Sequence, residues 1–227
     1  MITKIYFIEN SFDYNALNLN DNIIAGSEKT LINITNELGK NSNLSIKVFN
    51  NTTKPQSINN VQWLNISQIE KNDTPDFVVS MSDANLFYKL SAKKNYLWSH
   101  SVQNFEKFLR KSQLIPFIKF KPMMILEGDY HYKTRGFFTS FYGKSILKIA
   151  ADYDFINAKI DINFIPPANV IFTTRSDRNL KFLIQSWFEI KKYNDKAKLF
   201  INPPHILSQD EKINDIIVRN KSNKQLL

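Results

Sequence analysis

Three short segments of the chain carry residues whose types suit phosphate binding or proton transfer. Gly26 and Ser27 lie where a loop passes into a helical pattern, and a glycine there lets the backbone approach a phosphate at the helix N-terminus. His100 ends an apolar segment, and its imidazole could orient a hydroxyl group or sense a phosphate, because its charge changes near neutral pH. Arg175 and Arg178 follow another apolar segment, and such cations suit a diphosphate.

Each candidate also has an ordinary structural interpretation. Gly26 could belong to a simple tight turn, His100 could cap a helix or fill a core position, and the two arginines could form a solvated helix cap. The same structural interpretation is favoured for His131, which lies in a predicted helix, and for His205, which follows two prolines. We therefore keep His100 as the catalytic candidate, and Gly26, Ser27, Arg175 and Arg178 as phosphate-binding candidates.

Composition excludes several other kinds of site. The chain has no cysteine and three histidines, so a cysteine-ligated zinc site is excluded and no histidine spacing suggests one. The Asp-Tyr-Asp segment at 152–154 resembles a manganese-binding Asp-x-Asp, but it precedes a predicted linker and is not taken as a metal site. No phosphate-binding Walker loop and no serine nucleophile elbow is present. We expect neither a metal nor a cofactor.

Alternating strands and helices must position these candidates. Apolar runs predict strands at 4–8, 44–50, 76–81, 95–100, 122–128 and 145–150. A first helix is expected to be capped by Ser27 and to end at Gly39; further helices are expected at 101–111 and 131–141. In the 101–111 helix, Val102, Phe105, Phe108 and Leu109 would share the buried face. This order is typical of an α/β fold with a parallel sheet covered by helices on both faces.

A second domain is expected after a seam that contains the adjacent prolines Pro166 and Pro167, which suit a linker. The pattern then predicts a strand at 169–174, a helix at 178–192, a strand at 197–202, and a loop with an amphipathic helix at 203–220. We therefore predict an N-terminal domain at 1–165 and part of a C-terminal domain at 166–227.

The ordered set of motifs resembles the family 4 glycosyltransferases, which have the GT-B fold of two Rossmann-like domains. The segment "IIAGSEKTLINITNEL" is similar to the Gly-Gly-x-Glu loop and helix of that family, with Ala25 in place of the first glycine. The segment "YLWSHS" resembles its Trp-x-His strand end, and "KSILKIAADYDFI" resembles the close of its N-terminal domain. The segment "NVIFTTRSDRNLKFLIQSWFEIKKYNDKAKLFI" resembles the opening of its donor domain.

This resemblance implies a transferase that moves a sugar from a nucleotide-sugar to a carbohydrate or lipid-linked acceptor, as in cell-envelope or polysaccharide synthesis. Its acceptor-side domain would be 1–165, and its donor-side domain 166–227. The donor diphosphate would lie near Gly26, His100, Arg175 and Arg178, where Arg178 stands in place of the family's lysine. The glutamate pair that holds the donor in this family has no counterpart after Asn202, so the donor domain is expected to be truncated.

Two other functions remain open at this point. A truncated chain could be a non-catalytic binding or interaction module that self-associates through its incomplete C-terminal domain. The net charge of +9 could attract anionic partners, but the basic residues are spread along the chain and form no known nucleic-acid module, so we expect no nucleic acid partner.

With no signal-like or membrane-spanning segment in the sequence, we expect a cytoplasmic protein with peripheral contact to the anionic inner face of the membrane.

Overall fold

The computed structural model of the chain has two compact units, Met1–Tyr153 and Asp154–Leu227. The structure describes residues 2–19, 21, 24–70, 72–101, 103–134, 136–148, 167–172 and 179–201. The predicted domain boundary at 165–166 lies outside the described residues, as do the predicted site residues Arg175 and Arg178 and the predicted helix within 203–220.

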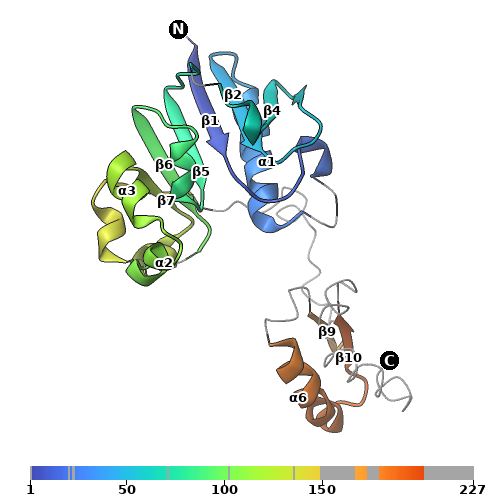
Figure 1. The fold of residues 1–227 in the computed structure, drawn as a ribbon. Coiled ribbons are helices and arrows are strands. Elements are labelled where there is room, and N and C mark those ends of the chain that lie inside the picture. Colours follow the sequence, from blue (N-terminus) through green and yellow to red (C-terminus); the bar gives the residue numbers. More distant parts are fainter. Residues whose placement is uncertain are drawn as a thin grey trace. The chain divides into compact units, whose positions relative to one another are not determined.

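Unit 1 is built on a mostly parallel sheet, in which eight strands are described (Figure 1). The strands are β1 (Thr3–Ile8), β2 (Leu44–Asn50), β3 (Gln56–Ile58), β4 (Val61–Asn65), β5 (Phe77–Met81), β6 (Lys94–Ser99), β7 (Met123–Leu126) and β8 (Lys144–Ile146). Their order across the sheet is β3-β4-β2-β1-β5-β6-β7-β8, and among the described pairs the β3–β4 pair is the antiparallel one. The α/β class and the parallel sheet are therefore confirmed.

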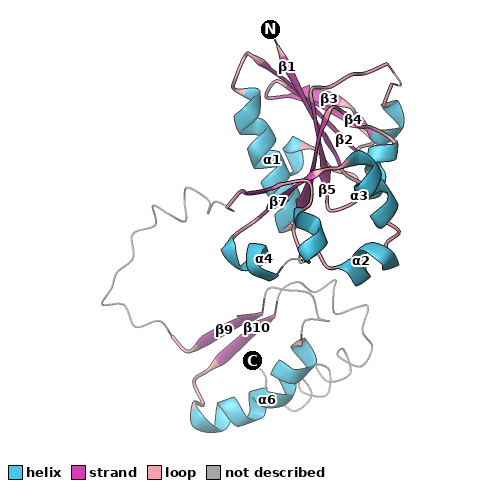
Figure 2. Ribbon diagram, turned by 90° about the vertical axis from the view of Figure 1, so that its left-hand side faces the viewer, coloured by secondary structure: helices cyan, strands magenta, loops and turns pink. Residues whose placement is uncertain are grey.

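Helices cover both faces of this sheet, and Figure 2 shows α1 on one side and α3 on the other. The helices are α1 (Gly26–Gly39), α2 (Phe105–Arg110), α3 (Leu114–Phe120) and α4 (Asp129–Thr134). Short 3₁₀ turns lie at Ala16–Asn18, Ile66–Gln68, Ala84–Tyr88 and Phe137–Ser140. The chain runs from β1 to β2 on one side of β1 and returns to β5 on the other, so the strand order changes direction between β1 and β5.

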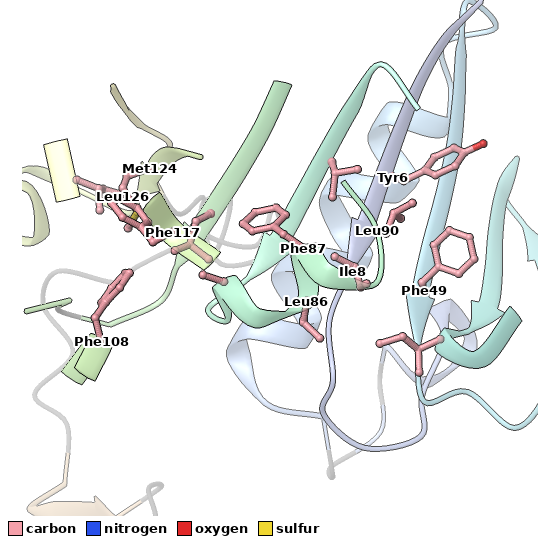
Figure 3. Packing of buried hydrophobic residues seen from close by; sticks show 14 residues of the cluster. Tyr6, Ile8, Phe49, Leu86, Phe87, Leu90, Phe108, Phe117, Met124 and Leu126 are labelled. Carbon is pink, nitrogen blue, oxygen red and sulfur yellow. The ribbon is translucent and has the colours of Figure 1, made fainter. Parts of the chain in front are cut away.

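Successive side chains of the central strands feed two separate cores. Tyr6 and Ile8 of β1 join one cluster, whereas Phe7 between them joins the other. The first cluster packs β-strand side chains against Phe87, Phe108 and other residues from the α2–α3 side (Figure 3). The second packs the other face of the sheet against α1. Because both faces are buried, β1 and β5 contain short continuous apolar runs.

Unit 2 contains a β–α–β arrangement of β9 (Asn169–Phe172), α6 (Leu180–Tyr193) and β10 (Lys198–Ile201). The two strands pair in parallel. Leu180, Ile184 and Trp187 are buried along one face of α6. Phe172 and Ile201 of the strands pack against that face.

Three expectations about unit 1 are wrong. Ser27 does not cap α1: Ala25 is the N-cap, and the Ser27 hydroxyl lies inside the first turn, where it donates a hydrogen bond to Glu28. Phe105 and Leu109 do not face the core, because α2 is a short helix in which only Phe108 is buried. The predicted helix at 131–141 is instead α4 followed by a 3₁₀ turn.

The β3–β4 hairpin and α3 have no counterpart among the predicted elements. Asn59 and Asn60 form the two-residue turn of this hairpin, both with positive φ, as the turn types that match strand twist require. This turn touches the end of α1. A Cβ atom at Gly39 would overlap with the carbonyl oxygen of Asn59 and lie 3.0 Å from Cγ2 of Val61. Gly39 is therefore required by close packing between α1 and the hairpin.

We predict that Gly39→Ala lowers the free energy of unfolding by about 1–3 kcal/mol, because the added methyl group must displace backbone. Gly26→Ala is the matched control, since a Cβ at Gly26 would meet no atom within 4 Å. Urea denaturation of both variants measures the difference. Equal stability of the two variants would show that the hairpin turn moves away from α1 without cost.

Candidate functional site

A pocket of about 260 Å³ lies at the carboxyl ends of the central strands of unit 1. Glu9 follows β1, Ser82 follows β5 and His100 follows β6, and all three line it together with Ser27 of α1. The pocket sits where the strand order changes direction, between β1 and β5. In open α/β sheets this crevice is the usual place for a ligand.

The imidazole of His100 has a partner at one ring nitrogen and none at the other. Its Nδ1 pairs with the Glu127 carboxylate, which follows the neighbouring strand β7. Its ring stacks on Trp98 at a centroid distance of 5.0 Å. Its Nε2 is buried and has no hydrogen-bond partner. Carboxylate pairing at Nδ1 fixes the ring so that Nε2 can accept a proton, which is the arrangement of a general base.

His131 supports this arrangement from α4. Its Nε2 lies 2.8 Å from the backbone oxygen of Ser101, next to His100, and its Nδ1 is 3.4 Å from the backbone nitrogen of Glu127. The side chain thus ties together the two loops that carry the His100–Glu127 pair. This position agrees with the structural role expected for His131.

Glu9 is the most deeply buried carboxyl group of the pocket, with 6% of the residue exposed. Burial raises its pKa to about 7, and hydrogen bonds from the Ser11 hydroxyl and backbone nitrogen oppose the shift without cancelling it. The nearby charge of Glu28 raises this pKa further. Glu9 therefore changes its charge near neutral pH.

Tyr14 adds a buried hydroxyl group to the same pocket. This hydroxyl interacts with the Glu9 carboxyl group and thereby lowers the pKa of Glu9, while the Tyr14 ring packs edge-on against Trp63. Burial raises the pKa of Tyr14, and the carboxyl groups of Glu9 and Glu28 raise it further, so the hydroxyl keeps its proton. Buried polar groups are normally hydrogen-bonded. Nε2 of His100 lacks such a partner, which makes it a candidate to bond a ligand.

The remaining charges of the pocket are mostly negative. Glu28 and Asp83 contribute carboxylates, and Lys111 contributes the cation among the lining residues. Asp83 already accepts hydrogen bonds from the backbone and side chain of Asn85. The N-terminus of α1 faces this set of acids, which weakens its attraction for an anion. The pocket is thus better suited to hydroxyl groups than to phosphate.

Some of the site residues predicted from the sequence lie together in the structure, and further residues of the site were not predicted. Ser27 and His100 line one pocket, and Gly26 lies beside it as the first residue of α1. Glu9, Tyr14 and Glu127 were not singled out from the sequence. The two glutamates share one signal that could have found them: each directly follows an apolar strand, in "FIEN" and in "ILEG".

A larger hollow of about 670 Å³ lies at the opposite end of the strands, near Thr3, Phe77 and Lys94. None of the unpartnered buried side-chain atoms found in the described part of the chain lines this hollow. We therefore regard the smaller pocket at the carboxyl ends as the candidate site, because its polar lining and its position in the sheet both indicate a place for a ligand.

Comparison with models of known protein families gave no match, and comparison with curated proteins gave none either. Among the described residues, no group of three or more acidic or histidine side chains is arranged to hold a metal ion. The same residues contain no helix with the length and apolar character needed to cross a bilayer. The assignment of a function therefore depends on the geometry of the pocket.

The raised pKa of Glu9 predicts a pH-dependent stability. Between its ordinary pKa of 4.5 and its folded value of about 7, the folded chain holds a proton that the unfolded chain releases. Stability is therefore lost as the pH rises through this window, by about 3 kcal/mol for this group alone. In Glu9→Gln this loss should be absent, so the variant should have the flatter stability–pH curve.

Denaturation in urea at a series of pH values tests this prediction. Glu37→Gln is the matched control, because the Glu37 side chain is 70% exposed and its removal should leave the wild-type curve unchanged. Parallel curves for wild type and Glu9→Gln would contradict the proposed titration of Glu9.

Proposed function

We propose that the protein is a glycosyltransferase of the GT-B type, which moves a sugar from a nucleotide-sugar to a hydroxyl group of a carbohydrate or lipid-linked acceptor. The observation that carries the proposal is the His100–Glu127 pair: His100 lines a pocket at the carboxyl ends of the strands, and its Nε2 is buried without a hydrogen-bond partner. The parallel sheet of unit 1 and the strand–helix–strand order of unit 2 agree with the two Rossmann-like domains of that fold.

The pocket of unit 1 is proposed to hold the acceptor. The Tyr14 hydroxyl and the carboxyl groups of Glu9 and Glu28 can bond sugar hydroxyls, whereas the acidic lining disfavours a diphosphate. Gly26 and Ser27, expected from sequence to bind phosphate, would in this arrangement border the acceptor. Arg175 and Arg178 remain the proposed ligands of the donor diphosphate.

In the proposed reaction the acceptor hydroxyl attacks the anomeric carbon of the donor sugar. A new carbon–oxygen bond forms, the bond from that carbon to the diphosphate oxygen breaks, and its electron pair leaves with the nucleoside diphosphate. The hydroxyl proton passes to Nε2 of His100. The Glu127 carboxylate then stabilises the imidazolium through Nδ1, as expected for general base catalysis.

We predict that His100→Gln lowers kcat by roughly 10²- to 10⁴-fold with little change in KM, because proton removal assists the transition state more than it assists binding. Glu127→Gln should also lower kcat, since the imidazolium loses its neutralising charge. The measurement is nucleotide release when the full chain is incubated with UDP-, GDP- or ADP-sugars and a panel of glycan and lipid-linked acceptors. Glu37→Gln, at an exposed position, should retain wild-type turnover.

Two results would contradict the proposal. One is turnover that is unaffected by His100→Gln. The other is the absence of nucleotide release with every donor. In that case the melting temperature of the chain, measured with and without added sugars, distinguishes a chain that binds sugars without catalysis from one that does not bind them. A shift that depends on Tyr14 and Glu9 would support the non-catalytic binding module.

A further inference from the structure

The outer faces of α2 and α3 expose a group of large apolar side chains. Phe105 and Leu109 of α2 are each 52% exposed, and in α3 Ile115 is 72% and Ile118 is 53% exposed. The two residues of each helix are separated by four or three positions, so they share one helical face. The inner faces are anchored in the core by Phe108 and Phe117, whose rings meet edge-on at 5.1 Å (Figure 3).

Basic side chains lie among these apolar residues. Between Phe105 and Lys121 the sequence has five basic residues against one acidic residue, Glu106. Arg110, Lys111, Lys119 and Lys121 are exposed. Burial lowers the pKa of Lys107, and the adjacent charges of Lys111 and Arg110 lower it further, which reflects a positive local potential. We call this surface the α2–α3 patch: Phe105, Leu109, Ile115 and Ile118 with Arg110, Lys111, Lys119 and Lys121.

We propose that the α2–α3 patch docks unit 1 on an anionic lipid surface. Exposed apolar side chains surrounded by lysine and arginine are the pattern of helices that lie in the membrane interface. The apolar groups enter the boundary between headgroups and acyl chains, and the cations attract anionic headgroups. A protein partner fits less well, because lysine is depleted at protein–protein interfaces.

The position of Lys111 links the patch to the candidate site. Lys111 follows α2 directly, and it also lines the pocket that contains His100. The patch and the lining of that pocket therefore share a residue. Docking would bring lipid-linked hydroxyl groups to the site, although the docking itself does not rest on the transfer reaction.

Vesicle binding by the full chain tests the proposal. The chain should co-sediment with vesicles of phosphatidylcholine and phosphatidylglycerol more strongly than with phosphatidylcholine alone, and added salt should weaken the difference. Arg110→Gln with Lys119→Gln should lower the partition coefficient on anionic vesicles about 25-fold, at about fivefold for each cation. Ile115→Ser with Ile118→Ser should lower it by about a hundredfold on either vesicle type.

Unit 2 provides matched controls. Lys181→Gln with Lys196→Gln removes the same charge from exposed positions outside the patch, and Phe182→Ser removes a side chain that is 69% exposed in α6. Both should bind vesicles as the wild type does. Melting temperatures of all variants identify any that fail to fold, and Arg110→Gln and Lys119→Gln can then be measured separately.

Three outcomes would overturn the proposal. The first is equal binding to the two vesicle types, and the second is equal loss of binding in patch and control variants. The third is a wild-type chain that forms a dimer without lipid and that Ile115→Ser with Ile118→Ser converts to a monomer. That result would assign the patch to self-association instead.

Discussion

The burial of the central sheet on both faces is the constraint on which unit 1 depends. Tyr6, Phe7 and Ile8 alternate between two cores, so a shift of β1 by one residue would move every side chain to the wrong face. The same constraint acts on β5 and β6, and it fixes where each strand ends. Glu9, Ser82 and His100 are brought together because the register of three buried strands leaves them at one edge.

The polar groups at that edge are arranged at a cost to stability. A carboxyl group as buried as Glu9 is easier to protonate than an exposed one, and the unpartnered Nε2 of His100 gives up a hydrogen bond to water. A fold selected for stability alone would replace them with apolar side chains. Their presence in one pocket is therefore the strongest structural indication that the pocket binds a ligand.

The elements with strong local sequence patterns were predicted, whereas features that depend on contacts between distant parts of the chain were missed. β2 matched its predicted bounds of 44–50 because its apolar residues alternate between polar ends. The α3 helix was missed because Pro116 interrupts its apolar run, yet that proline lies in the first turn, where a missing N–H costs little. His100 could be chosen from the end of a strand. Its pairing with Glu127 could not, because it requires knowing that β6 and β7 are neighbours.

The two outermost described strands of the sheet in unit 1 have a consequence for the behaviour of the chain at high concentration. β3 and β8 are each three residues long; Pro55 directly precedes β3, and Lys144 begins β8. Short edge strands flanked by proline and lysine offer few free backbone groups for another chain to join. The apolar strands between them are thus enclosed by edges that discourage growth of the sheet from one molecule to the next.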